Sequence, residues 1–160
     1  MKCIACGGGT MTSAREDRPF VDLPDVTLVG VWVHRCSACG EYEVEIPRPA
    51  ALGRTIALAL VEKAGPFEAA EFRFLRKRLD LSAEELARYL AVDKATVSRW
   101  ENGRSPAPVA VDRVVRGLVR DLEPVPVGVR AAVPRLAGLS VSGPMNLRVR
   151  NEEGGWAVAA

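Results

Sequence analysis

The spacing of apolar residues changes along this chain, from strand-like alternation near the start to helical periodicity in the middle. Residues 26–33 are rich in β-branched and apolar side chains, and residues 41–46 alternate polar with apolar. Both patterns are typical of strands. Residues 50–64 then favour a helix, which Pro49 is placed to open and the Gly-Pro pair at 65–66 is placed to end.

Helical periodicity continues after residue 67. It first predicts an amphipathic helix over residues 68–79. Ser82 and Glu85 then form a Ser-x-x-Glu capping box, which predicts the start of a second helix.

Two more helices are predicted further along. Asp93 is placed to cap a helix over residues 94–102, which Gly103 ends. The tight turn before this helix predicts a helix-turn-helix unit. Residues 108–122 form another amphipathic helix, and its wide apolar stripe favours packing on the domain and a twofold interface. The stripe consists of Val111, Val114, Val115, Leu118, Val119 and Leu122.

The end of the chain carries a weaker pattern. Three prolines within residues 124–134 predict an extended linker. Residues 146–151 alternate, residues 152–155 offer a turn, and residues 156–158 can return as a strand. We therefore expect a small terminal β-hairpin.

Together these elements predict an α+β protein. We expect a small metal-bound β domain over residues 1–47 and a linker helix over residues 48–66. An all-α helix-turn-helix domain follows over residues 67–122, and a C-terminal extension, with the β-hairpin, covers residues 123–160.

Charge narrows the function only slightly. Residues 1–66 carry seven basic and eight acidic groups, residues 67–122 eleven and nine, and residues 123–160 four and three. No segment is basic enough to establish nucleic-acid binding by charge alone. The chain opens without an apolar leader, and no apolar run approaches the roughly 18 residues that a membrane span needs, so we expect a cytoplasmic protein.

All the cysteines fall in two Cys-x-x-Cys pairs, Cys3/Cys6 and Cys36/Cys39, each followed by a glycine suited to positive φ. Four thiolates at this spacing predict a closed tetrahedral site for structural zinc. Iron held by four thiolates uses the same spacing and stays open, as does His34 as an alternative ligand. Disulfides need an oxidising compartment, and a thioredoxin-type pair needs a βαβ pattern, so both are disfavoured.

The helix over residues 94–102 should bury Val97 and Trp100 and present its other side to a DNA major groove. Near the starts of two helices, Ser82 and Lys94 suit phosphate contacts. The candidate DNA-binding residues are Ser82, Lys94, Ala95, Thr96, Ser98, Arg99, Asn102 and Arg104.

Two stretches carry a family resemblance. Leu-Arg-x-x-Leu-x-Leu-Ser-x-x-Glu-Leu-Ala at 75–87 and Thr-Val-Ser-Arg-Trp-Glu-Asn-Gly at 96–103 resemble Xre/Cro helix-turn-helix domains. Joined to the two cysteine pairs, this order resembles the MqsA-type antitoxins, in which a YgiT-type zinc domain precedes an Xre domain. The resemblance covers about residues 1–122.

The resemblance implies an antitoxin of a toxin-antitoxin pair. In that family the zinc domain is structural and can contact the toxin, while the other domain dimerises and represses the promoter of its own operon. It implies that Cys3, Cys6, Cys36 and Cys39 hold Zn²⁺ and that Arg99 is the chief base reader. The implied partners are double-stranded operator DNA, the toxin and a second copy of the chain.

Three alanines depart from the family pattern. Ala83 replaces a glutamine that often touches DNA, and Ala95 replaces an asparagine that reads adenine, so the operator sequence does not transfer. Ala91 replaces the usual turn glycine, which costs about 1 kcal/mol if that residue must be left-handed.

The sequence fits two other functions less well than that of an antitoxin. A stand-alone transcriptional regulator with a structural zinc domain and no toxin stays open. An enzyme is disfavoured, because one histidine and four committed cysteines assemble no nucleophile-base pair and no open metal site.

Overall fold

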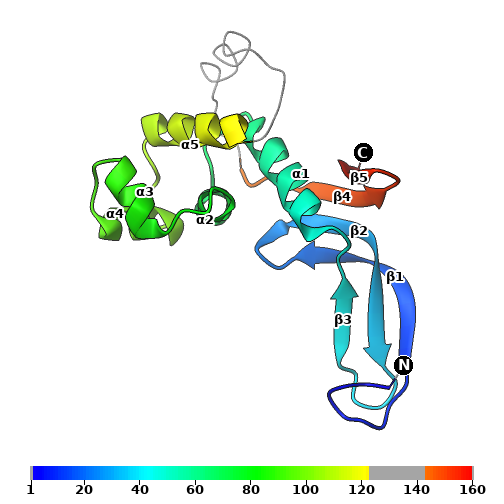
Figure 1. Cartoon of the computed structure of the whole chain (residues 1–160). Helices are drawn as coiled ribbons and strands as arrows, with labels where there is room; N and C mark the ends of the chain where they lie inside the picture. Colours follow the sequence, from blue (N-terminus) through cyan, green and yellow to red (C-terminus); the bar gives the residue numbers. More distant parts are fainter. Residues whose placement is uncertain (1, 123–142, 160) are drawn as a thin grey trace.

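The structure is a computed structural model and describes residues 2–122 and 143–159 (Figure 1). Within these residues the chain forms one five-stranded sheet and five helices, so the predicted α+β class is confirmed. The linker predicted from the prolines within residues 124–134 lies outside the described residues.

A long hairpin forms the base of the sheet. β1 (Met11–Phe20) and β2 (Leu23–Cys36) pair antiparallel, and β3 (Tyr42–Glu45) pairs antiparallel with the last part of β2. Both strands predicted from the sequence are therefore confirmed, as β2 and β3. The prediction lacked β1, because its solvent-exposed positions are so polar that no apolar alternation marks it.

The predicted terminal hairpin is present. β4 (Leu147–Glu152) and β5 (Gly155–Val158) pair antiparallel, and β4 also pairs in parallel with β2. The hairpin thus extends the same sheet that carries the N-terminal strands (Figure 1).

Five helices make up the remainder of the described chain. Figure 1 shows α1 running between the sheet and the other helices. Their bounds are α1 (Pro49–Val61), α2 (Ala69–Arg78), α3 (Ala83–Tyr89), α4 (Lys94–Glu101) and α5 (Val109–Leu122).

Local caps define several helix ends. The Ser82 hydroxyl accepts from the N–H of Glu85, and the Glu85 carboxylate accepts from the N–H of Ser82, so the predicted capping box is confirmed. Asp93 occupies the N-cap position of α4, but its side chain makes no capping hydrogen bond.

Three successive helices end in the same hydrogen-bond pattern, with one residue in the left-handed region after the helix. These residues are Asp80, Ala91 and Gly103, with φ of 55°, 53° and 68°. After α3, the N–H of Ala91 donates to Arg88 and the N–H of Val92 donates to Ala87, which is a Schellman motif. Ala91 is therefore left-handed, as the sequence comparison with the turn glycine anticipated.

The core is continuous from the sheet to the helices. Leu52, Ile56 and Leu60 on α1 are each at most 1% exposed, and α1 contacts β4 and β5 on one side and α2 and α5 on the other. Burying one such side chain contributes about 1.5–3 kcal/mol. This single helix therefore joins the two halves of the core.

An arginine inside the protein fixes the end of α1. Arg116 is 1% exposed and pairs with the buried carboxylate of Asp112. Its guanidinium donates to the carbonyls of Val61, Lys63 and Gly65 at 2.6–2.9 Å. These carbonyls turn toward Arg116 instead of continuing the helix. The predicted end of α1 at residue 64 is therefore wrong, and the helix stops at Val61.

The predicted apolar stripe of α5 is only partly buried. Val115 and Val119 are buried, but Val114 is 46% and Leu118 is 36% exposed. Arg116 and Asp112 face inward, because the α1 carbonyls and the N–H of Phe67 need partners. The Leu122 side chain lies outside the described part of the structure.

Candidate metal centre and nucleic-acid interface

The four cysteines come together at the end of the sheet farthest from the helices. Cys3 and Cys6 lie in the loop before β1, whereas Cys36 ends β2 and Cys39 lies in the turn before β3. Their sulfur atoms all lie within 4.8 Å of one another, so they form a group that can hold a metal ion.

The sulfur positions fit a tetrahedral ion. The Cys3 and Cys39 sulfurs are 3.8 Å apart, and the Cys6 and Cys36 sulfurs are 3.6 Å apart. A tetrahedron with metal–sulfur bonds of about 2.3 Å has edges of about 3.8 Å. The donor set therefore matches a closed, four-coordinate site.

Glycines shape both loops of the cluster. Gly7 and Gly40 have φ of 69° and 73°, as predicted for the residue after each pair. Sequence reasoning missed Gly9, whose φ is ordinary. A Cβ atom on Gly9 would lie only 2.2 Å from the Cys36 sulfur. The N–H groups of Gly8 and Gly9 also lower the pKa of the Cys6 thiol.

The pKa values of the Cys36 and Cys39 thiols are shifted in opposite directions. The N–H groups of Cys39 and Ala38 lower the pKa of Cys36 to about 6. The N–H of Glu41 favours the Cys39 thiolate, but hydrogen bonds that the protonated Cys39 thiol makes with neighbouring sulfurs, together with burial, outweigh it and raise the pKa of Cys39 to about 12. A bound cation would displace the thiol protons, because cysteines ligate metals as thiolates.

His34 lies outside this cluster. Its Nδ1 is 2.7 Å from the Ser13 hydroxyl and its Nε2 is 3.4 Å from the Glu45 carboxylate. Both ring nitrogens thus face groups on the neighbouring strands, and the metal-ligand group found among the described residues consists of the four cysteines alone.

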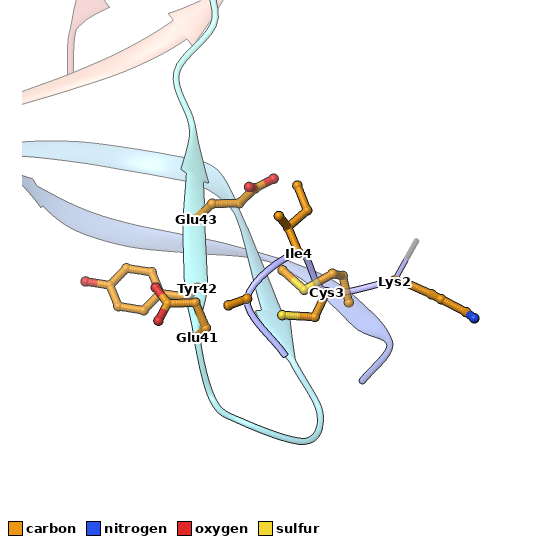
Figure 2. A pocket seen from close by; sticks show the side chains of 8 residues that line it. Lys2, Cys3, Ile4, Glu41, Tyr42 and Glu43 are labelled. Atoms are coloured by element: carbon orange, nitrogen blue, oxygen red, sulfur yellow. The ribbon is translucent and has the colours of Figure 1, made fainter. Parts of the chain in front are cut away.

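A shallow groove of about 310 Å³ runs beside the cysteine cluster (Figure 2). Ile4, between the first two cysteines, is 94% exposed, and Tyr42 at the start of β3 is 44% exposed. Glu41 and Glu43 line the same groove, and Figure 2 shows Lys2 extending away from β3. The groove is therefore apolar with an acidic border.

The predicted orientation of α4 is confirmed at its buried positions. Val97 is 0% and Trp100 is 6% exposed, and the Trp100 ring packs edge-on against Phe72 of α2. Lys94, Ala95, Ser98, Arg99, Asn102, Arg104 and Ser82 are exposed, and Thr96 is half-buried. The candidate DNA-binding residues of α4 therefore share the solvent face of one helix.

Two candidates on this face are already bonded within the protein. The Arg99 guanidinium donates to the Thr96 hydroxyl at 2.7 Å, one helical turn earlier. The Asn102 amide donates to the Ser98 carbonyl, and its oxygen accepts from Arg73 of α2.

Residues that position α4 were not identified from the sequence. Glu101, 8% exposed, accepts from Arg76 of α2 through both carboxylate oxygens, at 2.5 and 3.1 Å. Arg76 also donates to the Leu81 carbonyl before α3. This pair ties α4 to the two preceding elements. The sequence does contain a signal for this pair. Glu101 directly follows the buried Trp100 and does not lie on the predicted solvent-facing side of α4, so a buried partner for its charge could have been expected.

These features define a class: an α+β protein with a four-cysteine metal centre and a cluster of short helices. Residues 1–124 match the family described as the antitoxin component of a bacterial toxin-antitoxin system, MqsA, and the chain belongs to this family. The resemblance stated above is thereby confirmed. None of the curated proteins compared with the sequence matches it. Across the described ranges, no helix is both long and apolar enough to cross a membrane.

Proposed function

We propose that this protein is a cytoplasmic, non-enzymatic, DNA-binding antitoxin that represses its own operon and neutralises a cognate toxin by direct contact. The family match over residues 1–124 carries this proposal. In it, Cys3, Cys6, Cys36 and Cys39 bind structural Zn²⁺, because four thiolates prefer zinc and leave no coordination position open for catalysis.

For DNA binding we propose that α3, residues 90–93 and α4 act as a helix-turn-helix unit, with α4 in the major groove. Arg99 reads a base, and its bond to Thr96 holds its guanidinium over the exposed face. Ala95 can touch a thymine methyl group. Asn102 is bonded to Arg73 and Ser98, so we assign it the role of holding the helix in place.

The remaining candidates suit the DNA backbone. Ser82 and Lys94 are exposed near the N-terminal ends of α3 and α4, where N–H groups and positive charge favour phosphate. Ser98 lies on α4 and Arg104 lies just after it. We assign both side chains to phosphates of the DNA strand that Lys94 contacts. Backbone contacts fix the register, and Arg99 supplies sequence preference.

We propose that the protein binds DNA as a homodimer. Val114 and Leu118, one turn apart on α5, are exposed apolar side chains that a second copy can cover. A twofold arrangement places the two α4 helices about 34 Å apart, one turn of DNA. Sedimentation that showed only monomer at micromolar concentration would rule this out.

We propose that the groove beside the cysteine cluster receives the toxin. Its apolar floor, including exposed Ile4, fits an apolar side chain, and Glu41 and Glu43 favour a neighbouring lysine or arginine. Ile4→Asp removes the apolar contact and places a carboxylate where the apolar side chain of the toxin would be buried, so it should weaken toxin binding at least tenfold. Val21→Asp, at an equally exposed site on the β1–β2 turn, is the matched control.

Operator binding tests the DNA-binding part. Arg99→Ala should weaken binding to the DNA upstream of the gene by about 1–3 kcal/mol, or roughly 5- to 150-fold, measured by fluorescence anisotropy. Arg150→Ala removes an equal charge from an exposed site on β4 and should leave affinity unchanged. An equal loss on unrelated DNA would make Arg99 a phosphate contact.

Growth tests the antitoxin part. The neighbouring reading frames are expressed alone and then together with this protein. If one neighbouring reading frame arrests growth and co-expression of this protein restores it, the result supports an antitoxin and identifies the toxin. No arrest from either neighbour would favour the stand-alone regulator.

A further inference from the structure

The C-terminal hairpin lies beyond the region that matches the family. The match ends at residue 124, whereas β4 and β5 lie within residues 147–158. The hairpin nevertheless buries Leu147, Val149 and Trp156 to 7% exposure or less. The family match therefore does not describe the packing of the hairpin.

The hairpin pairs with a part of the β2 edge that β3 does not cover. On the side of β2 facing away from β1, β3 pairs only with residues 32–35. β4 pairs in parallel with residues 26–29 on the same side. Without β4, the backbone N–H and C=O groups that this stretch of the central strand directs away from β1 would be unpaired.

Three hydrogen bonds attach the hairpin to the point where the sheet passes into α1. The Trp156 indole N–H donates to the Pro47 carbonyl at 2.6 Å. The Arg48 guanidinium donates to the Asn151 side-chain oxygen at 2.5 Å and to the Glu152 carbonyl at 3.0 Å. All of these bonds join residues more than 100 positions apart in the sequence.

The chain at this point is also strained. Arg48 has φ of 49°, a left-handed conformation that costs an L-residue about 1–2 kcal/mol. Such a conformation persists only where surrounding contacts hold it. The Arg48 carbonyl accepts from the N–H groups of Ala51 and Leu52 at the start of α1, whereas the hydrogen bonds of its side chain go to the hairpin. Nearly two turns into α1, the Thr55 hydroxyl donates to the Trp156 carbonyl at 3.0 Å.

We propose that residues 143–159 are an intramolecular ligand that locks the junction at residues 47–49. Its binding site consists of the β2 edge at residues 26–29, the sheet-facing side of α1 and the Pro47 carbonyl. Occupancy of this site fixes the orientation of the cysteine cluster relative to α4. The functional consequence is that the toxin-binding and DNA-binding surfaces keep a fixed relative geometry. This consequence rests on the function proposed above.

Amide hydrogen exchange on the full chain tests the lock. In the double variant Arg48→Ala, Trp156→Ala, exchange in residues 26–29 and 47–55 should accelerate at least tenfold, while α4 stays unchanged. Val158→Ala is the matched control, because Val158 is 54% exposed on β5 and should alter neither region. Should the double variant lose its fold, Trp156→Phe keeps an aromatic ring but removes the indole N–H that bonds to Pro47 and part of the ring volume. A smaller acceleration in the same two regions is then expected.

Orientation is measured by ¹⁵N relaxation of the zinc-loaded chain. The wild type should show one rotational correlation time for β1–β2 and for α4, and the double variant should show two. Equal exchange rates in variant and control, or a single correlation time in both, would overturn the lock.

A cleavage site inserted at residue 135 of the full chain separates binding in cis from exchange between copies. After cleavage at low micromolar concentration, the hairpin fragment should coelute with the remaining chain at the size of the uncut protein. A fragment that separates, or complexes that form only by trading hairpins between copies, would also overturn the proposal. None of these measurements uses DNA or toxin, so their failure leaves the antitoxin proposal standing, and failure of operator binding leaves the lock standing.

Discussion

Gly9→Ala should damage the metal centre although residue 9 is not a ligand. The added Cβ would lie 2.2 Å from the Cys36 sulfur and 2.9 Å from the Ala38 Cβ. Ordinary contacts begin near 3.4 Å, so the sulfur must retreat by more than 1 Å. Metal sites tolerate distance errors of about 0.2 Å. The variant must therefore distort its backbone or lose Cys36 as a ligand.

The size of the effect follows from the cost of overpacking. Forcing one methyl group into a filled site costs about 1–3 kcal/mol. At about 1.4 kcal/mol per tenfold change, zinc affinity should fall roughly 5- to 150-fold. Because the free energy of metal binding contributes to folding, the loops around the cluster should lose structure at zinc concentrations that saturate the wild type.

Gly8→Ala is the matched control. The nearest heavy atom to a Cβ on Gly8 is the Cys6 carbonyl oxygen at 3.9 Å, which is ordinary contact. Zinc affinity is measured by competition with a chromophoric chelator, and the fold by circular dichroism. Affinities of the two variants within twofold of each other would refute the reasoning, because the predicted clash exists only at residue 9.

Three further predictions concern stability and metal loss. Ala91→Gly relieves a left-handed alanine and should raise the free energy of unfolding by about 0.5–1 kcal/mol, measured by urea denaturation; a lower midpoint would contradict it. Arg116→Ala leaves Asp112 buried without its partner and should lower that free energy by about 3–5 kcal/mol, whereas a loss below 1 kcal/mol would mean that the network contributes little. Chelation of zinc should speed amide exchange in residues 2–10 and 37–41 and leave residues 26–29, which β4 covers, protected; uniform exchange across β2 would show that the metal supports the entire sheet.

Local signals in the sequence predicted most of the helical part. Each relevant contact lies within a few residues: the capping box joins Ser82 to Glu85, and the spacing of Val97 and Trp100 orients α4. The two cysteine pairs were equally readable, because their chemistry requires that spacing. The left-handed turn at Ala91 followed from a missing glycine.

The remaining features depend on partners that are distant in the sequence. β1 is an edge strand with a mostly exposed, charged surface, so pairing with β2 rather than its own pattern makes it a strand. The sequence pattern suggests that Arg116 is a solvated helix residue, because its partners, the carbonyls of Val61 and of residues just after α1, are more than 50 positions away. The parallel pairing of β4 with β2 likewise has no local signal.

β2 is the strand with which three other strands of the sheet align. One strand, Leu23–Cys36, pairs with β1, β3 and β4 and ends in a cysteine of the cluster that can hold a metal ion. A pairing error of one residue would move Cys36 by about 3.3 Å, far outside the roughly 0.2 Å that a metal site tolerates. Such a slip would also turn the buried side of the strand outward. In the zinc-bound form proposed above, metal binding therefore favours the strand pairing near Cys36 that brings its sulfur to the other three.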